Sequence, residues 1–111
     1  MSLKVYYLDD EADLLEAFFD AYNSQAVSVK TFQRPEELYE AVKQDVPDLI
    51  FIDYRLPGTT GDQVALNLNP DIKKILVTGD LNIEHKGSFY LKIEKPLKRD
   101  KVRGLFNQLQ N

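Results

Sequence analysis

Side chains that can hold a cation or a charged group stand directly after short apolar runs of this sequence. They comprise four carboxylates, a hydroxyl and an ammonium: Asp9, Asp10, Glu11, Asp53, Thr78 and Lys95. Carboxylates that share a small space repel one another and raise each other's pKa unless a cation compensates them. Because the set offers oxygen ligands and neither His nor Cys, it suits a hard ion, and we expect a Mg²⁺ site.

The apolar runs predict the strands that must position these side chains. They are residues 3–8, 27–32, 49–52, 75–78 and 89–93. Runs 3–8 and 49–52 are almost free of charge, as strands buried on both faces of a parallel sheet are, while 27–32 and 89–93 suit its edges. The carboxyl ends of parallel strands meet at the crevice where ligands bind, so we expect the polar side chains to converge in one pocket.

Helical patterns alternate with these strands. Apolar residues at helical spacing predict helices over 11–23, from Pro35 to before Pro47, around 64–68 and over 97–109. Segment 79–88 has few apolar residues and two glycines, so we expect a vestigial or missing fourth helix there. The alternation predicts an α/β protein with a flavodoxin-like, doubly wound, five-stranded parallel sheet in the order 2-1-3-4-5.

Composition narrows the class of protein further. A chain of 111 residues without linker-like segments predicts one domain over residues 1–111. Its 14 basic and 18 acidic side chains give a net charge of −4, which disfavours direct contact with nucleic acid or an anionic membrane. Since there is no signal peptide and no apolar stretch long enough to span a bilayer, we expect a cytoplasmic protein. The absence of Cys excludes disulfides, thiolate metal sites and a cysteine nucleophile.

In this order, the polar residues resemble one known family, the receiver domains of two-component response regulators. The resemblance covers essentially the whole chain. It is carried by Asp9-Asp10-Glu11, by Asp53-Tyr54-Arg55-Leu56-Pro57-Gly58-Thr59-Thr60-Gly61, by Thr78-Gly79 and by Lys95-Pro96. Each piece alone is a weak signal, but in this order, each at a strand end, they form a strong joint one.

The resemblance implies a role for each residue. Asp53 looks like the phosphoacceptor, Asp10 like a direct Mg²⁺ ligand and Asp9 like a water-mediated one. Asp53 and the backbone carbonyl of Arg55 would complete the protein's contribution to the metal site, while Thr78 and Lys95 would stabilise the phosphoryl group. The peptide bond before Pro96 would be cis. Such a domain takes its phosphoryl group from a histidine kinase or phosphotransfer protein and catalyses only its own phosphorylation and dephosphorylation.

Two further expectations concern the lifetime and the output of the switch. Arg55 and Asp80 should overhang the mouth of the pocket, where an ion pair between them would slow hydrolysis of the phosphorylated protein. Lys92 stands where this family usually has an aromatic switch residue. The intervals from Gly61 to Thr78 and from Thr78 to Lys95 are also short by a turn or more of helix. We therefore expect segment 79–88 to replace the aromatic rotamer as an order-disorder switch.

Other interpretations of the same residues remain open. Asp10 can be a helix N-cap, Asp53 a turn residue, Thr78 an ordinary strand residue and Lys95 a surface lysine, and His85 is expected to be exposed and inert. A degenerate receiver would serve as a phosphorylation-independent interaction module. A Mg²⁺-dependent aspartyl phosphatase would show a D-x-D element after the first strand, which this chain lacks. The phosphoacceptor interpretation implies that the signal passes to a downstream protein or to an output domain absent from this chain.

Overall fold

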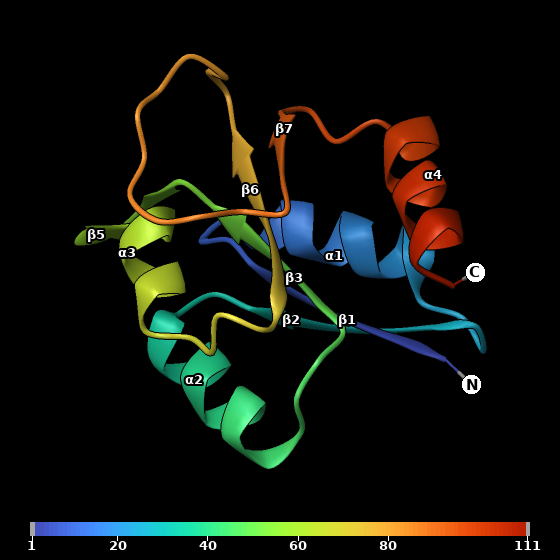
Figure 1. Cartoon of the computed structure of the whole chain (residues 1–111). Coiled ribbons are helices and arrows are strands. Elements are labelled where there is room, and N and C mark those ends of the chain that lie inside the picture. Colours follow the sequence, from blue (N-terminus) through green and yellow to red (C-terminus); the bar gives the residue numbers. More distant parts are fainter. Residues whose placement is uncertain (1, 111) are drawn as a thin grey trace.

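The chain forms one five-stranded parallel sheet, seen in the computed structural model, which describes residues 2–110 (Figure 1). Its strands are β1 (Leu3–Leu8), β2 (Val27–Phe32), β3 (Leu49–Asp53), β6 (Lys73–Thr78) and β7 (Leu91–Glu94). They lie in the order β2-β1-β3-β6-β7, and every neighbouring pair is parallel. This is the flavodoxin-like order that the sequence predicts.

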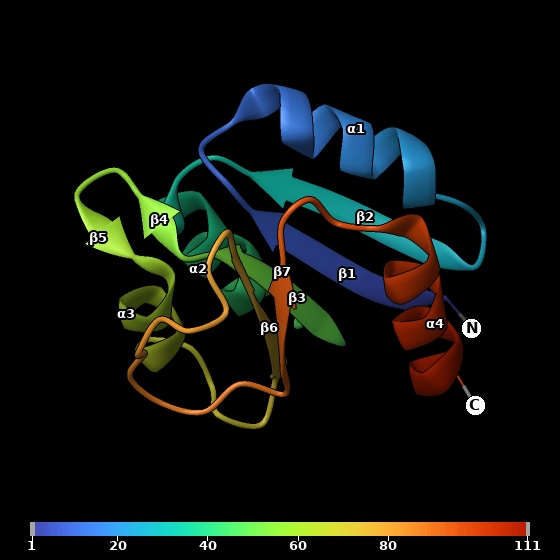
Figure 2. The ribbon, with the colours of Figure 1, turned by 90° about the horizontal axis from the view of Figure 1, so that it is seen from above.

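Helices cover both faces of the sheet. They are α1 (Ala12–Tyr22), α2 (Pro35–Gln44), α3 (Gly61–Leu66) and α4 (Arg99–Gln110). The apolar sides of α1 and α4 pack on one face, and those of α2 and α3 pack on the other (Figures 1 and 2). None of the helices in residues 2–110 is long and apolar enough to cross a bilayer.

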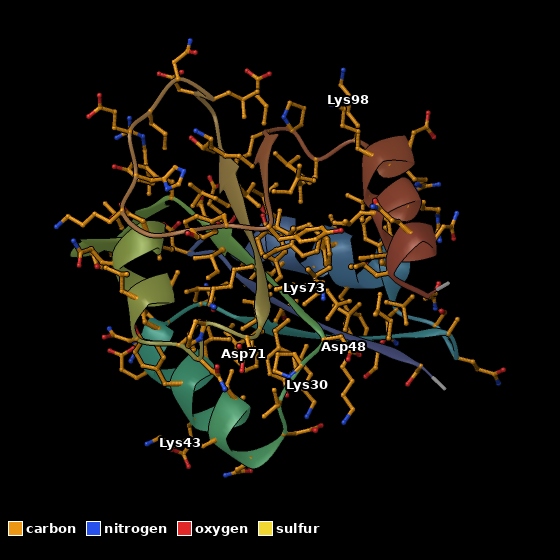
Figure 3. The ribbon with its side chains drawn as sticks, in the orientation of Figure 1. Lys30, Lys43, Asp48, Asp71, Lys73 and Lys98 are labelled. Atoms are coloured by element: carbon orange, nitrogen blue, oxygen red, sulfur yellow. The ribbon has the colours of Figure 1, made fainter. Side chains whose placement is uncertain are left out.

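The two faces of β1 show why this strand is apolar throughout. Val5 and Tyr7 pack into the cluster beneath α1 and α4, while Tyr6 and Leu8 pack into the cluster beneath α2. All four side chains are at most 2% exposed. Side chains alternate across a strand, so a strand covered on both faces needs a continuous apolar run. Charged side chains such as Lys43 on α2 and Lys98 just before α4 instead project into solvent (Figure 3).

Several element boundaries differ from those predicted. Strand β6 begins at Lys73 rather than at residue 75, and α3 spans Gly61–Leu66 rather than residues around 64–68. Helix α4 begins at Arg99 rather than at residue 97, and Leu97 packs against the core ahead of the helix. The peptide bond between Lys95 and Pro96 is cis. Strand β7 begins at Leu91 rather than at Phe89, whose side chain packs against the cluster on the opposite face from α4. The cis bond itself agrees with the expectation from the family resemblance.

A small hairpin that the sequence analysis did not predict lies just after β3. It pairs β4 (Arg55–Leu56) with β5 (Thr59–Thr60) in antiparallel fashion. Gly58 in its turn has a φ of 75°, which glycine adopts without steric cost. Gly61 follows the hairpin, and a Cβ there would overlap the backbone oxygen of Asp53. Both glycines therefore serve backbone geometry next to the candidate site.

The connection from β6 to β7, residues 79–90, contains no helix, as expected; we call it the β6–β7 segment. Its single histidine is not exposed, contrary to the expectation. The His85 ring is half-buried and stands edge-on to Phe89, with ring centres 5.1 Å apart. Since Phe89 packs against the core, His85 is part of the packing of this segment.

Candidate functional site

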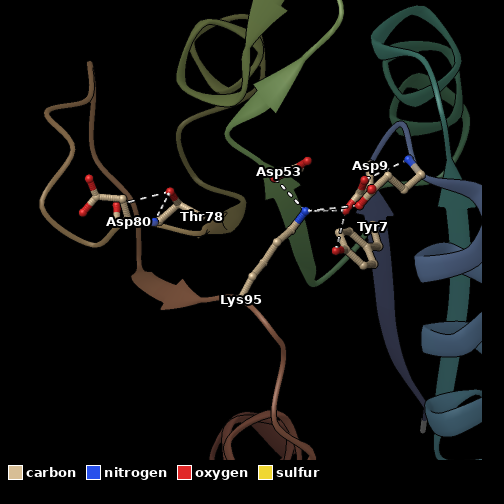
Figure 4. Close-up of polar contacts among 7 residues, drawn as sticks. Tyr7, Asp9, Asp53, Thr78, Asp80 and Lys95 are labelled. Atoms are coloured by element: carbon tan, nitrogen blue, oxygen red, sulfur yellow. Dashed lines mark hydrogen bonds and ion pairs between the residues drawn. The ribbon is translucent and has the colours of Figure 1, made fainter.

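The carboxyl ends of four strands bring the predicted residues together. Asp9 follows β1, Asp53 ends β3, Thr78 ends β6 and Lys95 follows β7 (Figure 4). Oxygen atoms of the Asp9, Asp10 and Asp53 carboxylates lie within 4.8 Å of one another. Beside them is a cavity of about 370 Å³, lined by Asp10, Glu11, Asp53, Tyr54, Arg55, Thr78, Gly79 and Lys95.

Lys95 is the cation at the centre of this cluster. Its Nζ lies 3.2 Å from Asp9 Oδ2 and 3.2 Å from Asp53 Oδ1, and 3.9 Å from Glu11 Oε2. Burial lowers the pKa of Lys95, but the nearby Asp53 and Asp9 carboxylates raise it by more, so its pKa is raised overall. Lys95 is therefore the permanently charged cation of the site rather than a solvated surface lysine.

Asp53 lies at the mouth of the buried strand β3 and is only 5% exposed. Burial, and then the charge of Asp9, raise the pKa of Asp53 to about 6, although Lys95 acts in the opposite direction. One ammonium thus does not fully compensate two buried carboxylates. At neutral pH the Asp53 carboxylate is still mostly ionised, which is the form that can act as a nucleophile.

Asp9 is fully buried and its carboxylate is held by three donors. Oδ1 accepts a hydrogen bond from the Glu11 backbone N–H (2.9 Å). Oδ2 accepts one from the Tyr7 hydroxyl (2.8 Å) and one from Lys95 (3.2 Å). The sequence analysis missed Tyr7. Tyr7 stands on β1 two residues before Asp9, and this spacing puts two side chains of an extended chain on the same face, which was the signal that could have revealed it.

Asp10 is exposed and does not cap α1. The N-cap residue of this helix is Glu11, and no side chain caps it. The interpretation of Asp10 as a helix cap is therefore wrong, and its carboxylate remains available on the wall of the cavity.

Thr78 is buried, and its hydroxyl engages the chain that follows it. The hydroxyl accepts a hydrogen bond from the Asp80 backbone N–H (3.1 Å) and donates to the Asp80 carbonyl oxygen (3.2 Å). To donate to a group on Asp53, this hydroxyl has to turn away from the Asp80 carbonyl. Thr78 thus links the pocket to the start of the β6–β7 segment.

The expected ion pair between Arg55 and Asp80 is not formed. Arg55 lines the cavity and is exposed. The Asp80 carboxylate instead accepts a hydrogen bond from the Asn82 backbone N–H (2.9 Å) and points away from Asp53 and Lys95 (Figure 4). The local turn after Thr78 therefore sets the direction of Asp80. The expected position of Arg55 is confirmed, the expected ion pair with Asp80 is wrong for this structure, and the role of both residues in phosphate lifetime stays a prediction.

Lys92 and Asp62 anchor the β6–β7 segment. Lys92 Nζ donates to the carbonyl oxygens of Leu81 (3.0 Å) and Ile83 (3.4 Å). The buried Asp62 carboxylate accepts hydrogen bonds from the Lys86 backbone N–H (2.8 Å) and the Thr60 hydroxyl. Burial raises the pKa of Asp62, but these and neighbouring hydrogen bonds lower it by more, so its pKa is lowered overall. The sequence analysis missed Asp62 as an anchor.

The donor set fits a divalent cation. Three carboxylates lie within 4.8 Å of one another, and the Lys95 ammonium pairs with only two of them, those of Asp9 and Asp53. Burial, and then the charge of Asp9, raise the pKa of Asp53. Oxygen ligands alone suit Mg²⁺. The carboxylates of Asp9, Asp10 and Asp53, with the backbone carbonyl of Arg55 in the adjoining hairpin, are the groups that would hold it.

Comparison with known proteins defines the class. Residues 5–103 match the family model of the response regulator receiver domain, and the chain belongs to this family. None of the curated protein sequences compared with the chain matches it.

Solved structures show the same fold. A response regulator receiver domain (CheY-like) from Methylobacillus flagellatus has a TM-score of 0.84 at 18% identity, covering 98% of this chain and 99% of its own. The response regulator TrrA from Thermotoga maritima, solved in complex with Mg²⁺-BeF, has a TM-score of 0.83 at 21% identity, covering 96% and 98%. The signal receiver domain of an HD domain-containing protein from Pseudomonas fluorescens has a TM-score of 0.87 at 15% identity, covering 99% and 95%.

Proposed function

We propose that this receiver domain accepts a phosphoryl group on Asp53 in a Mg²⁺-dependent reaction. The observation that carries the proposal is the position of the Asp53 carboxylate, buried within 4.8 Å of Asp9 and Asp10 and 3.2 Å from the Lys95 ammonium. The Mg²⁺-BeF complex of a structurally similar response regulator supports Mg²⁺ as the metal. The donor is a histidine kinase or a phosphotransfer protein, as is usual for this family.

The residues divide the work of phosphoryl transfer between them. An Asp53 carboxylate oxygen attacks phosphorus in line, and the bond from phosphorus to the donor's imidazole nitrogen breaks as the new bond from phosphorus to oxygen forms. Lys95 neutralises an oxygen of the transferred group, and Thr78 donates a hydrogen bond to it after turning from Asp80. Asp9, Asp10 and Asp53 would hold a Mg²⁺ ion, which would supply further positive charge to the phosphoryl oxygens.

The product is an acyl phosphate, which is labile to water and therefore suits a timed signal. The domain catalyses its own phosphorylation and dephosphorylation without acting as a conventional turnover enzyme. Its signal passes, in the cytoplasm, to a downstream protein or to an output domain outside this chain, and not to nucleic acid or a membrane directly. Family membership favours this role over an aspartyl phosphatase.

A second candidate function is a degenerate receiver that binds a partner without phosphorylation. The observation that favours it is Lys92, which replaces the aromatic switch residue and is occupied in anchoring the β6–β7 segment. The acidic cluster and Lys95 are intact, which favours the phosphoacceptor.

Intact mass after incubation with Mg²⁺ and acetyl phosphate separates the two. A phosphoacceptor gains one phosphoryl group, and both Asp53→Asn and removal of Mg²⁺ abolish the gain. Label that persists on another residue in Asp53→Asn would contradict the assignment of Asp53. A wild-type protein that takes up no phosphoryl group under these conditions would favour the degenerate receiver.

A further inference from the structure

Asp9 and Asp53 compete for a single ammonium. Lys95 Nζ is 3.2 Å from an oxygen of each carboxylate, and the Asp9 side chain is completely inaccessible to solvent. When a phosphoryl group on Asp53 engages Lys95, the contact between Lys95 and Asp9 is weakened. A buried carboxylate that loses a donor without replacement is strongly destabilised. The Glu11 backbone N–H stays on Oδ1, so it is Oδ2 that needs a second donor when Lys95 turns away.

Tyr7 has the properties of that donor. Its hydroxyl is 2.8 Å from Asp9 Oδ2, the same oxygen that Lys95 contacts. Its ring is fixed in the core, with centres 4.9 Å from Phe18 and 6.0 Å from Phe51. Lys95, in contrast, has a flexible side chain that is 25% exposed and reaches into the pocket from its edge. The hydroxyl is fixed while the ammonium is free to move.

We propose that Tyr7 is a positioning residue, whose hydroxyl holds the Asp9 carboxylate while Lys95 turns from Asp9 to the phosphoryl group on Asp53. The inference rests on the proposed function of Asp53. The Tyr7 hydroxyl contacts Asp9 (Figure 4), and Tyr7 does not line the cavity beside Asp53, so it would not touch a phosphoryl group there. Its effect on ligand affinity is confined to states in which Lys95 has turned away, that is, to the phosphorylated protein and its mimics. In the resting protein the same hydrogen bond contributes to stability.

The test compares Tyr7→Phe with Tyr6→Phe. Both variants keep the buried ring and remove one hydroxyl from β1. The Tyr6 hydroxyl donates to the Asp45 carbonyl oxygen (2.7 Å) and belongs to the opposite face of the sheet, so Tyr6→Phe is a matched control. Calorimetry measures two affinities for each protein: that for Mg²⁺ alone, and that for the phosphoryl mimic beryllofluoride at saturating Mg²⁺.

We expect Tyr7→Phe to bind beryllofluoride about tenfold more weakly, as loss of a hydrogen bond to a charged group implies. Its affinity for Mg²⁺ alone should stay at the wild-type value, because Lys95 then remains on Asp9. Tyr6→Phe should match the wild type in both. A pocket that was merely distorted would lose affinity for Mg²⁺ and beryllofluoride together, and that result would overturn the inference.

A double-mutant cycle shows whether Tyr7 acts through Asp9. In urea unfolding, Tyr7→Phe should lower the free energy of unfolding of the wild type by more than it lowers that of Asp9→Asn, which lacks the buried charge. Equal losses in both backgrounds would overturn the inference. If Tyr7→Phe binds beryllofluoride with the same affinity as the wild type, this inference alone is overturned. If the wild type binds no beryllofluoride, the proposed function is overturned as well.

Discussion

The Lys92 ammonium lies 3.0 Å from the carbonyl oxygen of Leu81 and ties β7 to the β6–β7 segment. A second contact, from the Lys86 backbone N–H to the Asp62 carboxylate, ties the same segment to the first turn of α3. A segment without a helix leaves backbone carbonyls that need donors, and Lys92 supplies one. Lys92, which stands where the family usually has an aromatic switch residue, thus has a structural role in this chain.

Replacing Lys92 with Met should loosen the segment. We expect faster hydrogen exchange at the amides of residues 81–86 and a free energy of unfolding lower by about 1 kcal/mol, a typical value for one intramolecular hydrogen bond. Lys98→Met is the control, because Lys98 is exposed and projects into solvent just before α4 (Figure 3). Equal exchange in the two variants would show that Lys92 does not anchor the segment.

A phosphoryl group or its mimic on Asp53 should first change the hydrogen bonds of the Asp80 backbone. The Asp80 N–H and carbonyl both bond to the Thr78 hydroxyl, which has to turn toward a phosphoryl group. We therefore expect beryllofluoride with Mg²⁺ to speed hydrogen exchange at residues 80–82, and to have no such effect in Thr78→Val. Beryllofluoride that binds yet leaves the exchange of residues 79–88 unchanged would contradict the segment's role as a switch.

The raised pKa of Asp53 predicts how stability depends on pH. Between its ordinary value of 3.8 and its folded value of about 6, Asp53 holds a proton more often in the folded chain than in the unfolded chain. The free energy of unfolding contributed by this group therefore falls as pH rises through that window and is constant above it.

Asp53→Asn removes this dependence. Without Mg²⁺, the variant should gain stability relative to the wild type as pH rises from about 4 to above 6, and Mg²⁺ should narrow the difference at neutral pH. Urea unfolding across this pH range, with and without Mg²⁺, measures it. Parallel pH profiles of the two proteins would show that the acidic pocket does not raise the pKa of Asp53.

Because Arg55 and Asp80 form no ion pair, we expect their replacement to have different effects on the lifetime of the acyl phosphate. Arg55 lines the cavity beside Asp53, so Arg55→Ala should expose the acyl phosphate to water and speed its hydrolysis. Asp80→Ala should change hydrolysis less, since its carboxylate points away from the pocket. Because Arg55 is exposed, stability should change by no more than about 1 kcal/mol. Intact mass over time measures the hydrolysis rate of each phosphorylated variant. If hydrolysis is accelerated equally in Arg55→Ala and Asp80→Ala, the ion pair forms in the phosphorylated protein.

The fold and the placement of the site were accessible from the sequence because they depend on local patterns. Apolar runs such as 49–52 identify buried parallel strands, and the alternation with helical patterns limits the topologies. Asp9, Asp53 and Lys95 converge because each follows a strand of the same parallel sheet, and that position can be read without knowing a side-chain conformation.

The hydrogen-bond partners were decided only by the tertiary structure. Lys92 meets carbonyls from the segment before β7, and Asp62 meets a backbone N–H 24 residues further along the chain. The Asp80 carboxylate bonds to the Asn82 backbone N–H rather than to Arg55. This donor lies only two residues further along the same turn, so the hydrogen bond costs little conformational entropy. Tyr7 looks like any buried strand residue until the position of Asp9 and the packing of Phe18 fix where its hydroxyl points. Such pairings depend on rotamers and on contacts between distant segments, which periodicity and strand position do not encode.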